Sequence, residues 1–402
     1  MTWSEIPLRS LYRRVEESGR PDLPLLSVYR DYGVVPRRGR EDNYNKPSAD
    51  LSGYKIVQRR DLVINKMKAW QGSLGVSNYD GIVSPAYFVG RPIGDVDDHF
   101  VHHLLRSSPL IAEYGARSKG IRPSQWDLPW NEFASIKVHL PTSDTQRELA
   151  SYLDTKTACI DALISKKRRI SDLFESRLIA HAEDAIKGRS SDKATGIPSL
   201  SGIPASWQVL RNKVFIREIN HRSIDGSDEM LSVSHITGVT PRSEKTVYMF
   251  EAESTVGYKL VRPGDLVINT MWAWMGAAGV SDAHGIVSPA YGVYEFDDSI
   301  MMPKFYDILV RTPAYIAEMT RFSRGVTSSR LRLYPDEFLR LLSPVPPIKT
   351  QKAIIERHAS HESTTSQARK CIARQIQLLL ERRQALITSV ITGEMSVPGV
   401  AA

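Results

Sequence analysis

The hydrophobic positions of this chain follow two patterns, short β-branched runs and long stretches with helical spacing. DLVIN from Asp61 and GIVSPAY from Gly81 are short apolar runs bounded by Gly and Pro, which is typical of buried strands. A helix is predicted after Ser108 and after Thr312, because both are N-cap types followed by a proline that fits the first helical turn. Most of the chain is therefore predicted to be mixed α and β.

Two stretches without internal proline, at about residues 145–187 and 351–392, carry the helical pattern. Ser143 with Gln146 resembles a capping box at the start of the first stretch. A helix of about 40 residues spans roughly 60 Å, and its narrow apolar stripe needs a partner. The two helices are therefore predicted to pair as a coiled coil, and the alternative is that each helix packs on its own domain.

The apolar positions expected to pack between these helices recur at spacings near three, four and seven. They are Leu149, Leu153, Ile160, Leu163, Ile170 and Phe174 in the first helix, and Ile354, Ala368, Ile372, Leu379 and Leu386 in the second. Polar residues interrupt the stripes at Lys156, Lys167, His358 and Thr365, so the seam is predicted to be imperfect.

An internal repeat covers about half of the chain. The 37 residues from Gly53 match those from Gly257 at 24 positions. In the first copy, the match continues upstream to Leu26 and downstream to Gln146. A period this long indicates a tandem duplication of a whole domain and not a solenoid.

These patterns divide the chain into two repeat domains, each followed by a long helix. The predicted boundaries are 1–142 for the first domain, 143–187 for the first helix, 188–206 for a linker, 207–346 for the second domain, 347–393 for the second helix and 394–402 for a C-terminal tail. The linker is assigned from a composition rich in Gly, Ser, Pro and Lys.

Composition narrows the class of protein. The 402 residues are 42% hydrophobic and 24% charged, as in globular proteins, and no apolar run is long enough for a transmembrane helix. The N-terminus lacks the apolar segment of a secretory signal, so a cytoplasmic location is expected. The two cysteines, Cys159 and Cys371, are expected to be reduced packing residues, with a disulfide as the alternative.

The motifs offer little support for catalysis by this chain. It has no phosphate-binding GxxxxGK[ST] loop, no GxSxG elbow, no HExxH and no zinc-spaced Cys/His cluster, so no metal or cofactor is expected on it. Ser84-Pro85-Ala86-Tyr87 and its copy at Ser288 resemble the loop with which amino-methyltransferases hold a flipped base. The second proline of that loop is alanine here and no glycine-rich cofactor loop precedes it, which favours a strand that ends in a proline turn.

The net charge of +8 suits a polyanionic partner, although many basic proteins bind no nucleic acid. A basic loop follows the predicted helix in each copy, and cations with small polar donors suit phosphate and base-edge contacts. The candidate DNA contacts are Arg117, Ser118, Lys119 and Arg122 in the first copy and Arg321, Ser323, Arg324, Arg330 and Arg332 in the second, with Arg59, Arg60, Lys66 and Lys68 as second choices. A solvated surface loop is the alternative for all of them.

Further positions have a structural and a functional interpretation. Trp70 and Trp274 are equivalent in the two copies and are expected in the core, with base stacking as the alternative. Asn65 and Asn269 are expected to satisfy backbone groups. The basic run 166–169 is expected to be a solvated helix face, with DNA contact as the alternative.

The order of repeat, long helix, linker, repeat and long helix resembles the specificity subunit of a type I restriction–modification system over nearly the whole chain. The Pro-x-x-Trp opening of that family's target recognition domains is similar to Ile203-Pro204-Ala205-Ser206-Trp207. The family's approach to its helices is similar to Pro344-Val345-Pro346-Pro347 through Gln351. Its closing stretch is similar to Arg383-Gln384-Ala385-Leu386-Ile387-Thr388 with Thr392-Gly393-Glu394. The first copy departs from the pattern in its short opening, Met1-Thr2-Trp3-Ser4, and in Leu140-Pro141-Thr142.

The resemblance implies a mixed α/β fold, a pseudo-twofold tandem repeat of two similar α+β target recognition domains separated by two long antiparallel helices that form a coiled coil. Each domain would read one half of a bipartite double-stranded DNA target. The helices would set the spacer and dock two methyltransferase (modification) subunits, which restriction and translocase subunits would join. S-adenosylmethionine, ATP and magnesium would be bound by those partners, and this chain would be non-catalytic.

Specificity is expected where the copies diverge, in residues 29–32, 35–50 and 117–132 against 234–237, 240–256 and 322–337. Two other function classes stay open. A stand-alone tandem-domain DNA-binding regulator would bind its site without a partner, whereas a self-contained DNA methyltransferase or nuclease would bind S-adenosylmethionine or a metal unaided.

Overall fold

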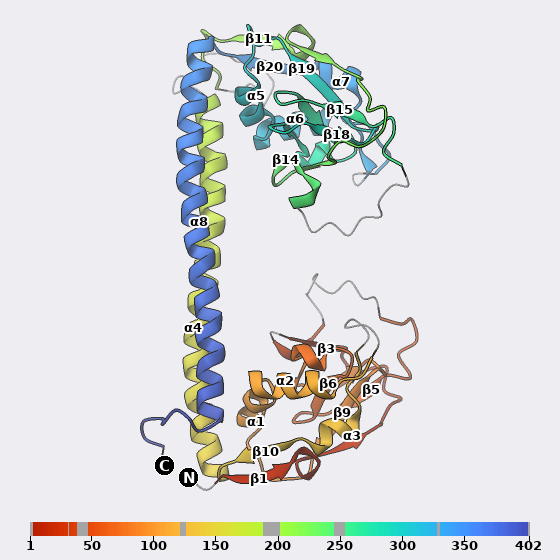
Figure 1. The fold of residues 1–402 in the computed structure, drawn as a ribbon, viewed down its shortest axis with the longest axis vertical. Helices are drawn as coiled ribbons and strands as arrows, with labels where there is room; N and C mark the ends of the chain where they lie inside the picture. Colours follow the sequence, from red (N-terminus) through yellow and green to blue (C-terminus); the bar gives the residue numbers. More distant parts are fainter. Residues whose placement is uncertain are drawn as a thin grey trace. The chain divides into compact units, whose positions relative to one another are not determined.

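The computed structural model describes residues 3–30, 32–37, 47–120, 126–187, 202–244, 254–327 and 330–400. The chain divides into two compact units, of which unit 1 comprises Met1–Arg168 and Ala373–Ala402, and unit 2 comprises Arg169–Ile372. Each unit holds one sequence repeat together with the start of one long helix and the end of the other (Figure 1). The mixed α and β composition predicted from the sequence is confirmed.

A four-stranded antiparallel sheet forms the centre of the first repeat. Its strands lie in the order β2 (Tyr12–Val15), β9 (Tyr87–Pro92), β6 (Leu62–Asn65) and β7 (Leu74–Val76). Three antiparallel pairs accompany it: β1 (Ser4–Pro7) with β10 (Lys137–Leu140), β3 (Leu26–Tyr29) with β4 (Gly33–Pro36), and β5 (Lys55–Val57) with β8 (Gly81–Val83). The helices of the repeat are α1 (Asp98–Leu105), α2 (Ser108–Arg117) and α3 (Trp130–Ser135).

The second repeat has the same elements in the same order. Its sheet runs β12 (Ile216–Glu218), β19 (Gly292–Phe296), β16 (Leu266–Ile268) and β17 (Ala278–Val280). The pairs are β11 (Gln208–Arg211) with β20 (Leu342–Val345), β13 (Leu231–Ser234) with β14 (Gly238–Pro241), and β15 (Lys259–Val261) with β18 (Gly285–Val287). The helices are α5 (Pro303–Val310), α6 (Pro313–Phe322) and α7 (Pro335–Arg340).

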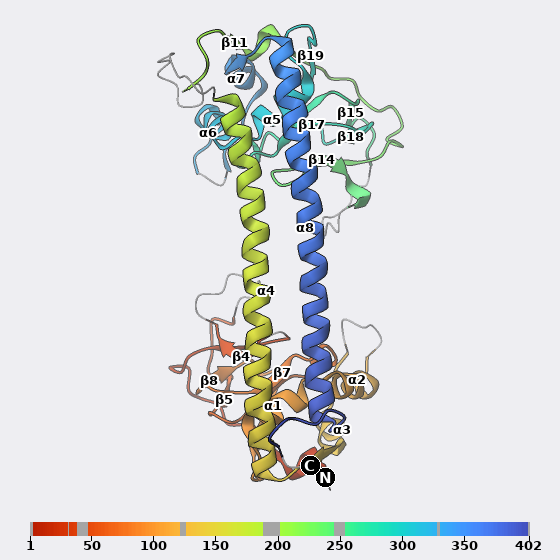
Figure 2. The ribbon, with the colours of Figure 1, turned by 90° about the vertical axis from the view of Figure 1, so that its left-hand side faces the viewer.

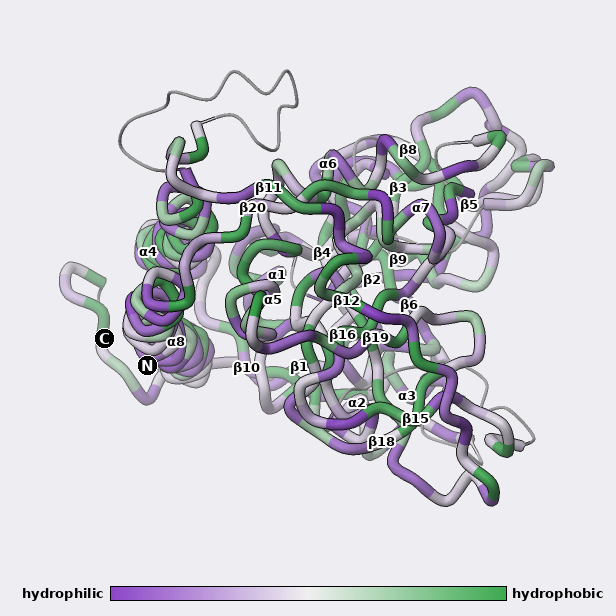
Figure 3. The backbone as a smooth tube through the Cα atoms, turned by 90° about the horizontal axis from the view of Figure 1, so that it is seen from above, coloured by the Kyte–Doolittle hydropathy of each residue, from purple (hydrophilic) through white to green (hydrophobic). Residues whose placement is uncertain are grey.

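The central strand of each sheet is covered on both faces, which explains why DLVIN is an unbroken apolar run. Leu62 and Ile64 of β6 point into a core shared with α1, α2 and α3, whereas Val63 points into a second core formed with β3, β5 and β8. This alternation follows from the pleat of a strand, and β16 repeats it with Leu266, Val267 and Ile268. In Figure 3 the apolar segments, drawn green, include the short helices α1 and α5.

The predicted helix starts differ slightly between the copies. Thr312 is the N-cap of α6, and its side chain accepts a hydrogen bond from the Tyr315 backbone N–H. In the first copy the N-cap of α2 is Ser107, one residue earlier than expected, and its side chain makes no capping hydrogen bond.

Two helices of 44 residues each follow the repeats, α4 (Ser143–Ile186) and α8 (Ile348–Ile391). At 1.5 Å per residue each is about 66 Å long. In unit 1 the start of α4 packs beside the end of α8, and Leu153 and Ile387 join the core of the first repeat (Figure 2). In unit 2 the end of α4 packs beside the start of α8, and Ile186 and Ile354 join the second core. The helices therefore run antiparallel within each unit, as the resemblance implies.

The seam between the helices differs from the predicted stripe near the middle of α4. Ile164 is buried, whereas Leu163 and Ile170 are 43% and 46% exposed. Steps of three and four residues from Ile160 lead to Ile164, Lys167 and Ser171, so Leu163 and Ile170 fall on the neighbouring stripe.

The other predicted packing residues lie in the seam. Leu149, Leu153, Ile160 and Ile354 are buried, and Phe174, Ala368, Ile372, Leu379 and Leu386 are half-buried. The polar residues Lys167, His358 and Thr365 are also half-buried in it, whereas Lys156 is exposed. An ion pair joins the helices in each unit, Asp161 with Arg383 at 3.0 Å in unit 1 and Glu175 with Arg369 at 3.2 Å in unit 2.

The segments that follow the long helices also pack on the repeats. After α8, Gly393 takes a left-handed conformation (φ 76°), and Met395 and Val397 then contact the core of unit 1 beside Trp3. Before the second repeat, Ile203 is buried in the core of unit 2 beside Trp207, the first residue of that repeat. Parts of the predicted linker and C-terminal tail are therefore packed.

Cys159 and Cys371 are both exposed, so the packing role expected for them is wrong. Within the described ranges, no helix has the length and apolar character needed to cross a bilayer. In the same part of the chain, no three His, Cys, Asp or Glu side chains are grouped to hold a metal ion.

Candidate nucleic-acid interface

The Asn of DLVIN and the Tyr of SPAY join neighbouring strands in both repeats. Asn65 Nδ2 donates to the Tyr87 hydroxyl at 3.3 Å, and Asn269 Nδ2 donates to the Tyr291 hydroxyl at 3.0 Å. Asn269 also accepts from the Met271 backbone N–H, which is the backbone role expected for it. Burial raises the pKa of both tyrosines. The SPAY tyrosine is thus engaged within the fold, which favours the structural interpretation of this motif.

The chain leaves the sheet after each of these asparagines in a short exposed loop. In both copies one 3-10 turn follows, Ala69–Gln71 and Ala273–Met275, and it ends at a glycine with φ 85°, a conformation that favours Gly. Met67 and Met271 are 46% and 45% exposed at the start of the loop.

Trp70 and Trp274 stabilise this loop. Both are half-buried, so the core position expected for them is wrong. The Trp70 indole N–H donates to the Met67 carbonyl at 3.2 Å, and that of Trp274 donates to the Met271 carbonyl at 3.0 Å. Trp70 also meets the Trp126 ring edge-on, with the ring centroids 5.3 Å apart. The two tryptophans are therefore supports of the loop.

The basic segment after α2 or α6 closes on itself and lies against this loop. Lys119 and Asp127 exchange two backbone hydrogen bonds of 2.9 and 2.8 Å, and Leu128 N–H then donates to the Lys66 carbonyl at 3.0 Å. In the second repeat Arg324 and Arg332 exchange the same pair of bonds. The two candidate segments thus form one surface in each repeat, here called the loop–hairpin surface: residues 66–68 with 118–120 and 126–128, and residues 270–272 with 323–327 and 330–333.

Most candidate cations on or beside this surface carry an ion pair within the protein. Lys66 pairs with Asp127 at 2.8 Å and Lys119 with Glu132 at 3.0 Å. The remaining pairs are Arg117 with Glu113, Arg321 with Glu318, and Arg324 with Glu337. The side chains of Lys119 and Arg324 are nevertheless 72% and 68% exposed. The Lys119–Glu132 pair is open to solvent on both sides and contributes little to stability, so a phosphate can replace this carboxylate at small cost.

The other candidates have different surroundings. Ser118 and Ser323 donate to the Tyr114 and Met319 carbonyls, where they end α2 and α6. Arg330 is exposed. The Arg332 guanidinium lies 5.6 Å from the Tyr334 ring centroid and donates to Thr270 Oγ1 at 3.3 Å.

Arg59 and Arg60 lie at the opposite end of β6 from the loop, so they do not join the loop–hairpin surface. Arg60 has φ 77° and pairs with Asp98 at 2.7 Å. Arg59 is exposed, and its backbone N–H donates to Asp80. Arg122 lies outside the described residues.

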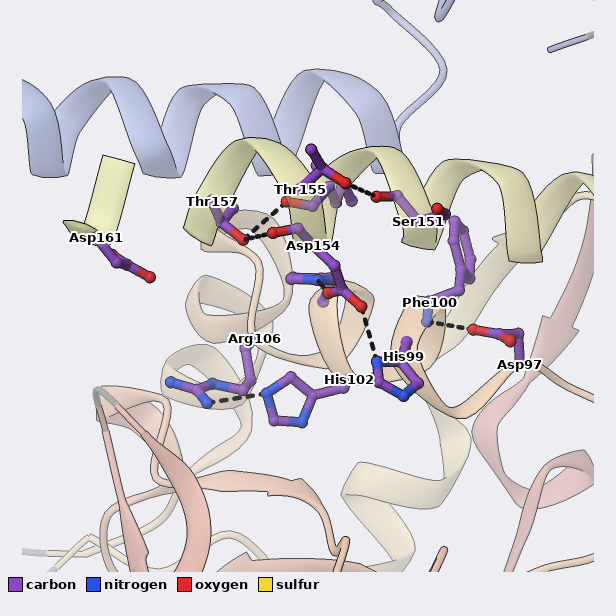
Figure 4. Close-up of polar contacts among 12 residues, drawn as sticks. Asp97, His99, Phe100, His102, Arg106, Ser151, Asp154, Thr155, Thr157 and Asp161 are labelled. Carbon is purple, nitrogen blue, oxygen red and sulfur yellow. Dashed lines mark hydrogen bonds and ion pairs between the residues drawn. The ribbon is translucent and has the colours of Figure 1, made fainter. Parts of the chain in front are cut away.

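A second polar cluster joins α1 to α4 in unit 1 (Figure 4). His99 Nδ1 lies 2.8 Å from Asp154 Oδ2, and His103 Nε2 lies 2.7 Å from Asp154 Oδ1. The hydrogen bond with His103 lowers the pKa of Asp154. The cluster attaches the first repeat to its long helix, away from the loop–hairpin surface.

No family model and no curated protein matches this sequence. Among solved structures, a chain from a study of complex assembly and conformational transition of the type I R-M system is 14% identical over 98% of both chains, with a TM-score of 0.68. The HsdS subunit from Thermoanaerobacter tengcongensis is 14% identical over 98% of this chain and 97% of its own, with a TM-score of 0.48. The type I S subunit from M. genitalium is 11% identical over 96% of each chain, with a TM-score of 0.35. The first likeness shows that this chain shares its fold over nearly the full length.

Two exposed aromatic residues of the second repeat were not among the sequence candidates. Trp272 lies on the loop–hairpin surface and Tyr334 directly follows it in the chain, and they are 50% and 47% exposed. Each surface thus offers cations and exposed apolar groups together, which can contact phosphates, base edges and the methyl group of thymine.

Proposed function

We propose that this chain is the DNA-specificity subunit of a type I restriction–modification complex. The observation that carries the proposal is the duplicated loop–hairpin surface, one copy per repeat, with cations on a shared backbone scaffold. The full-length fold likeness to a chain of a type I system supports the same assignment. Each repeat reads one half of a bipartite double-stranded DNA target.

The two long helices set the spacer between the half-sites. A 44-residue helix is about 66 Å long, close to two turns of B-DNA at about 34 Å per turn. The helices also dock two methyltransferase subunits, to which restriction and translocase subunits bind. In this proposal S-adenosylmethionine, ATP and magnesium are held by those partners, and this chain contributes recognition and no chemistry.

The test is to express the chain with its neighbouring methyltransferase subunit and to map methylated adenines across the genome. A split motif with a fixed gap is expected. Exchange of one divergent block between the copies, such as 117–132 for 322–337, should change one half-site and leave the other intact. A contiguous motif, or no methylation that depends on this chain, would overturn the proposal.

Calorimetry on the isolated chain separates the other function classes. No binding of S-adenosylmethionine is expected, whereas a self-contained methyltransferase would bind it. Tight, sequence-specific DNA binding without any partner would instead favour a stand-alone regulator.

A further inference from the structure

Position 68 of the first repeat and position 272 of the second have the same backbone conformation but different side chains. Lys68 has φ −127° and ψ 14°, and Trp272 has φ −125° and ψ 11°. The same 3-10 turn and the same left-handed glycine follow both residues. The loop therefore presents a lysine in one repeat and a tryptophan in the other from the same place on the fold.

This is the one position of the loop where the copies differ and both side chains are exposed. The segment from DLVIN to the glycine differs at three positions, 66/270, 68/272 and 71/275. Lys66 is held by Asp127, and Thr270 is buried and donates to the Ala290 carbonyl at 2.9 Å. Gln71 is exposed but Met275 is half-buried. Lys68 is exposed, and Trp272 is 50% exposed.

Trp272 has no evident role in the fold. Trp274, two residues later, supports the loop through its indole N–H. Within the described ranges the indole N–H of Trp272 meets no acceptor, and the Lys68 ammonium meets no carboxylate. An indole left half in water costs free energy that a bound partner would recover, because it removes apolar surface from solvent.

The surroundings of Trp272 define the chemistry of that partner. Leu333 N–H donates to the Thr270 carbonyl at 2.9 Å, which fixes the hairpin beside the loop. That hairpin carries Arg324, with a 68% exposed side chain, and Arg332, which lies over Tyr334. Aromatic rings interleaved with cations suit a nucleic acid, whose phosphates meet the cations while its bases meet the rings.

We infer that position 68/272 is a specificity determinant, an inference that rests on the proposed function. The Lys68 ammonium donates to base-edge acceptors such as O6 and N7 of guanine, whereas the Trp272 ring packs on the methyl group of thymine and disfavours polar edges. The two repeats thereby prefer different bases at corresponding places in their half-sites, although the surrounding sequence is shared. Met67 and Met271 are the same in both copies and add no discrimination.

The experiment is a reciprocal exchange in the full chain, expressed with its methyltransferase partner and analysed by genome-wide methylation mapping. Lys68→Trp should change the preferred base at one or two positions of the half-site read by the first repeat only. Trp272→Lys should do the same in the other half-site. Discrimination at the affected position should change by about 5- to 150-fold, the range for one good base contact.

Position 71/275 offers a matched control on the same turn. Gln71→Met and Met275→Gln should leave the motif unchanged. Trp272→Phe should retain the base preference and Trp272→Ala should lose it, and recovery of the assembled complex establishes that each variant folds.

The outcomes separate this inference from the proposed function. A wild-type chain that directs no split motif would overturn the proposed function. A split motif that is unaltered by both exchanges would overturn the inference alone. The inference also fails if Trp272→Lys only steepens the salt dependence of DNA binding, by about 0.9 in log–log slope, because the new lysine would then contact phosphate and not a base.

Discussion

One region of the core, here called the corner, differs in polarity between the two repeats. In the first repeat it is filled by four buried apolar side chains, and in the second repeat four buried side chains with polar groups occupy the equivalent positions. The pairs are Leu8 and Asn212, Val101 and Tyr306, Leu110 and Tyr315, and Val138 and Ser343. Each of the eight side chains is at most 7% exposed.

The polar corner is tolerated because its groups satisfy one another. Asn212 Nδ2 donates to the Phe338 carbonyl and to the Tyr315 hydroxyl, both at 3.0 Å. The Tyr315 hydroxyl lies 2.7 Å from those of Ser343 and Tyr306, and Ser343 donates to Asn212 Oδ1 at 2.7 Å. A closed network avoids the cost of an unpaired buried polar group. The comparison teaches that this fold requires a filled and satisfied corner and not a particular polarity.

The largest expected effect comes from moving one polar group into the apolar corner. Leu8→Asn should destabilise unit 1 by about 3–5 kcal/mol, because leucine packing is lost and the amide has no partners. Asn212→Leu should cost unit 2 less, about 2–3 kcal/mol, since the hydroxyls of Tyr315 and Ser343 can still bond each other. Urea unfolding followed by hydrogen exchange in each unit would measure both. Equal losses would show that the network is no better satisfied than a single polar group.

The joint between each repeat and the long helix that follows it contains a buried glutamine, and replacing this residue should have a similar effect on stability in both units. Gln146 accepts from the Asp97 N–H at 3.0 Å and donates to the Pro141 carbonyl at 2.9 Å. Gln351 accepts from the Met302 N–H at 2.8 Å and donates to the Pro346 carbonyl at 2.9 Å.

Replacement of either buried glutamine by alanine should therefore cost about 1–3 kcal/mol, because its backbone partners lose their hydrogen bonds. The same unfolding measurement tests this. Glu148→Ala, an exposed position on the same helix, is the control and should change little. A loss confined to one unit would break the equivalence of the two joints.

Acidification should change the stability of the two units in opposite directions. The reason is that a histidine, His102, and an aspartate, Asp307, occupy equivalent positions in the two repeats. Burial, aided by the Arg106 guanidinium, lowers the pKa of His102 to about 3. The unfolded chain then binds the proton more tightly, so unit 1 loses stability as the pH falls from about 6.5 towards 3. Burial raises the pKa of Asp307, so unit 2 loses stability as the pH rises above about 4 and regains it on acidification.

Each of these groups contributes a slope of at most about 1.4 kcal/mol per pH unit. Pulse proteolysis in urea at several pH values, with fragments assigned to each unit by mass spectrometry, would record the two slopes. His102→Gln should flatten the slope of unit 1, and Asp307→Asn that of unit 2. If both groups gave pH slopes of the same sign, the prediction that the two units respond oppositely to acid would be wrong.

The smallest effect is expected at the ion pairs between the helices. Arg383→Ala in unit 1 and Arg369→Ala in unit 2 should each cost less than about 1 kcal/mol, because Asp161 and Glu175 are well exposed. The loss should diminish further in high salt. A larger loss in one unit, measured by urea unfolding at low and high salt, would identify the pair on which that unit's helices depend.

The sequence by itself determined the repeated architecture and the two long helices. The short apolar run in DLVIN, N-cap residues before proline and apolar spacings of three and four are local signals, and they act wherever they recur in the chain. The shared blocks therefore predicted matching elements in both copies.

Only the tertiary structure decided which groups meet. Whether Leu163 or Ile164 enters the seam depends on the steps of the partner helix, because both residues fit an apolar stripe. Whether Lys119 is neutralised depends on Glu132, which a separate helix brings to it. Whether Asn212 can be buried depends on a carbonyl and two hydroxyls from other elements. Such pairings join residues far apart in the sequence, and no local pattern encodes them.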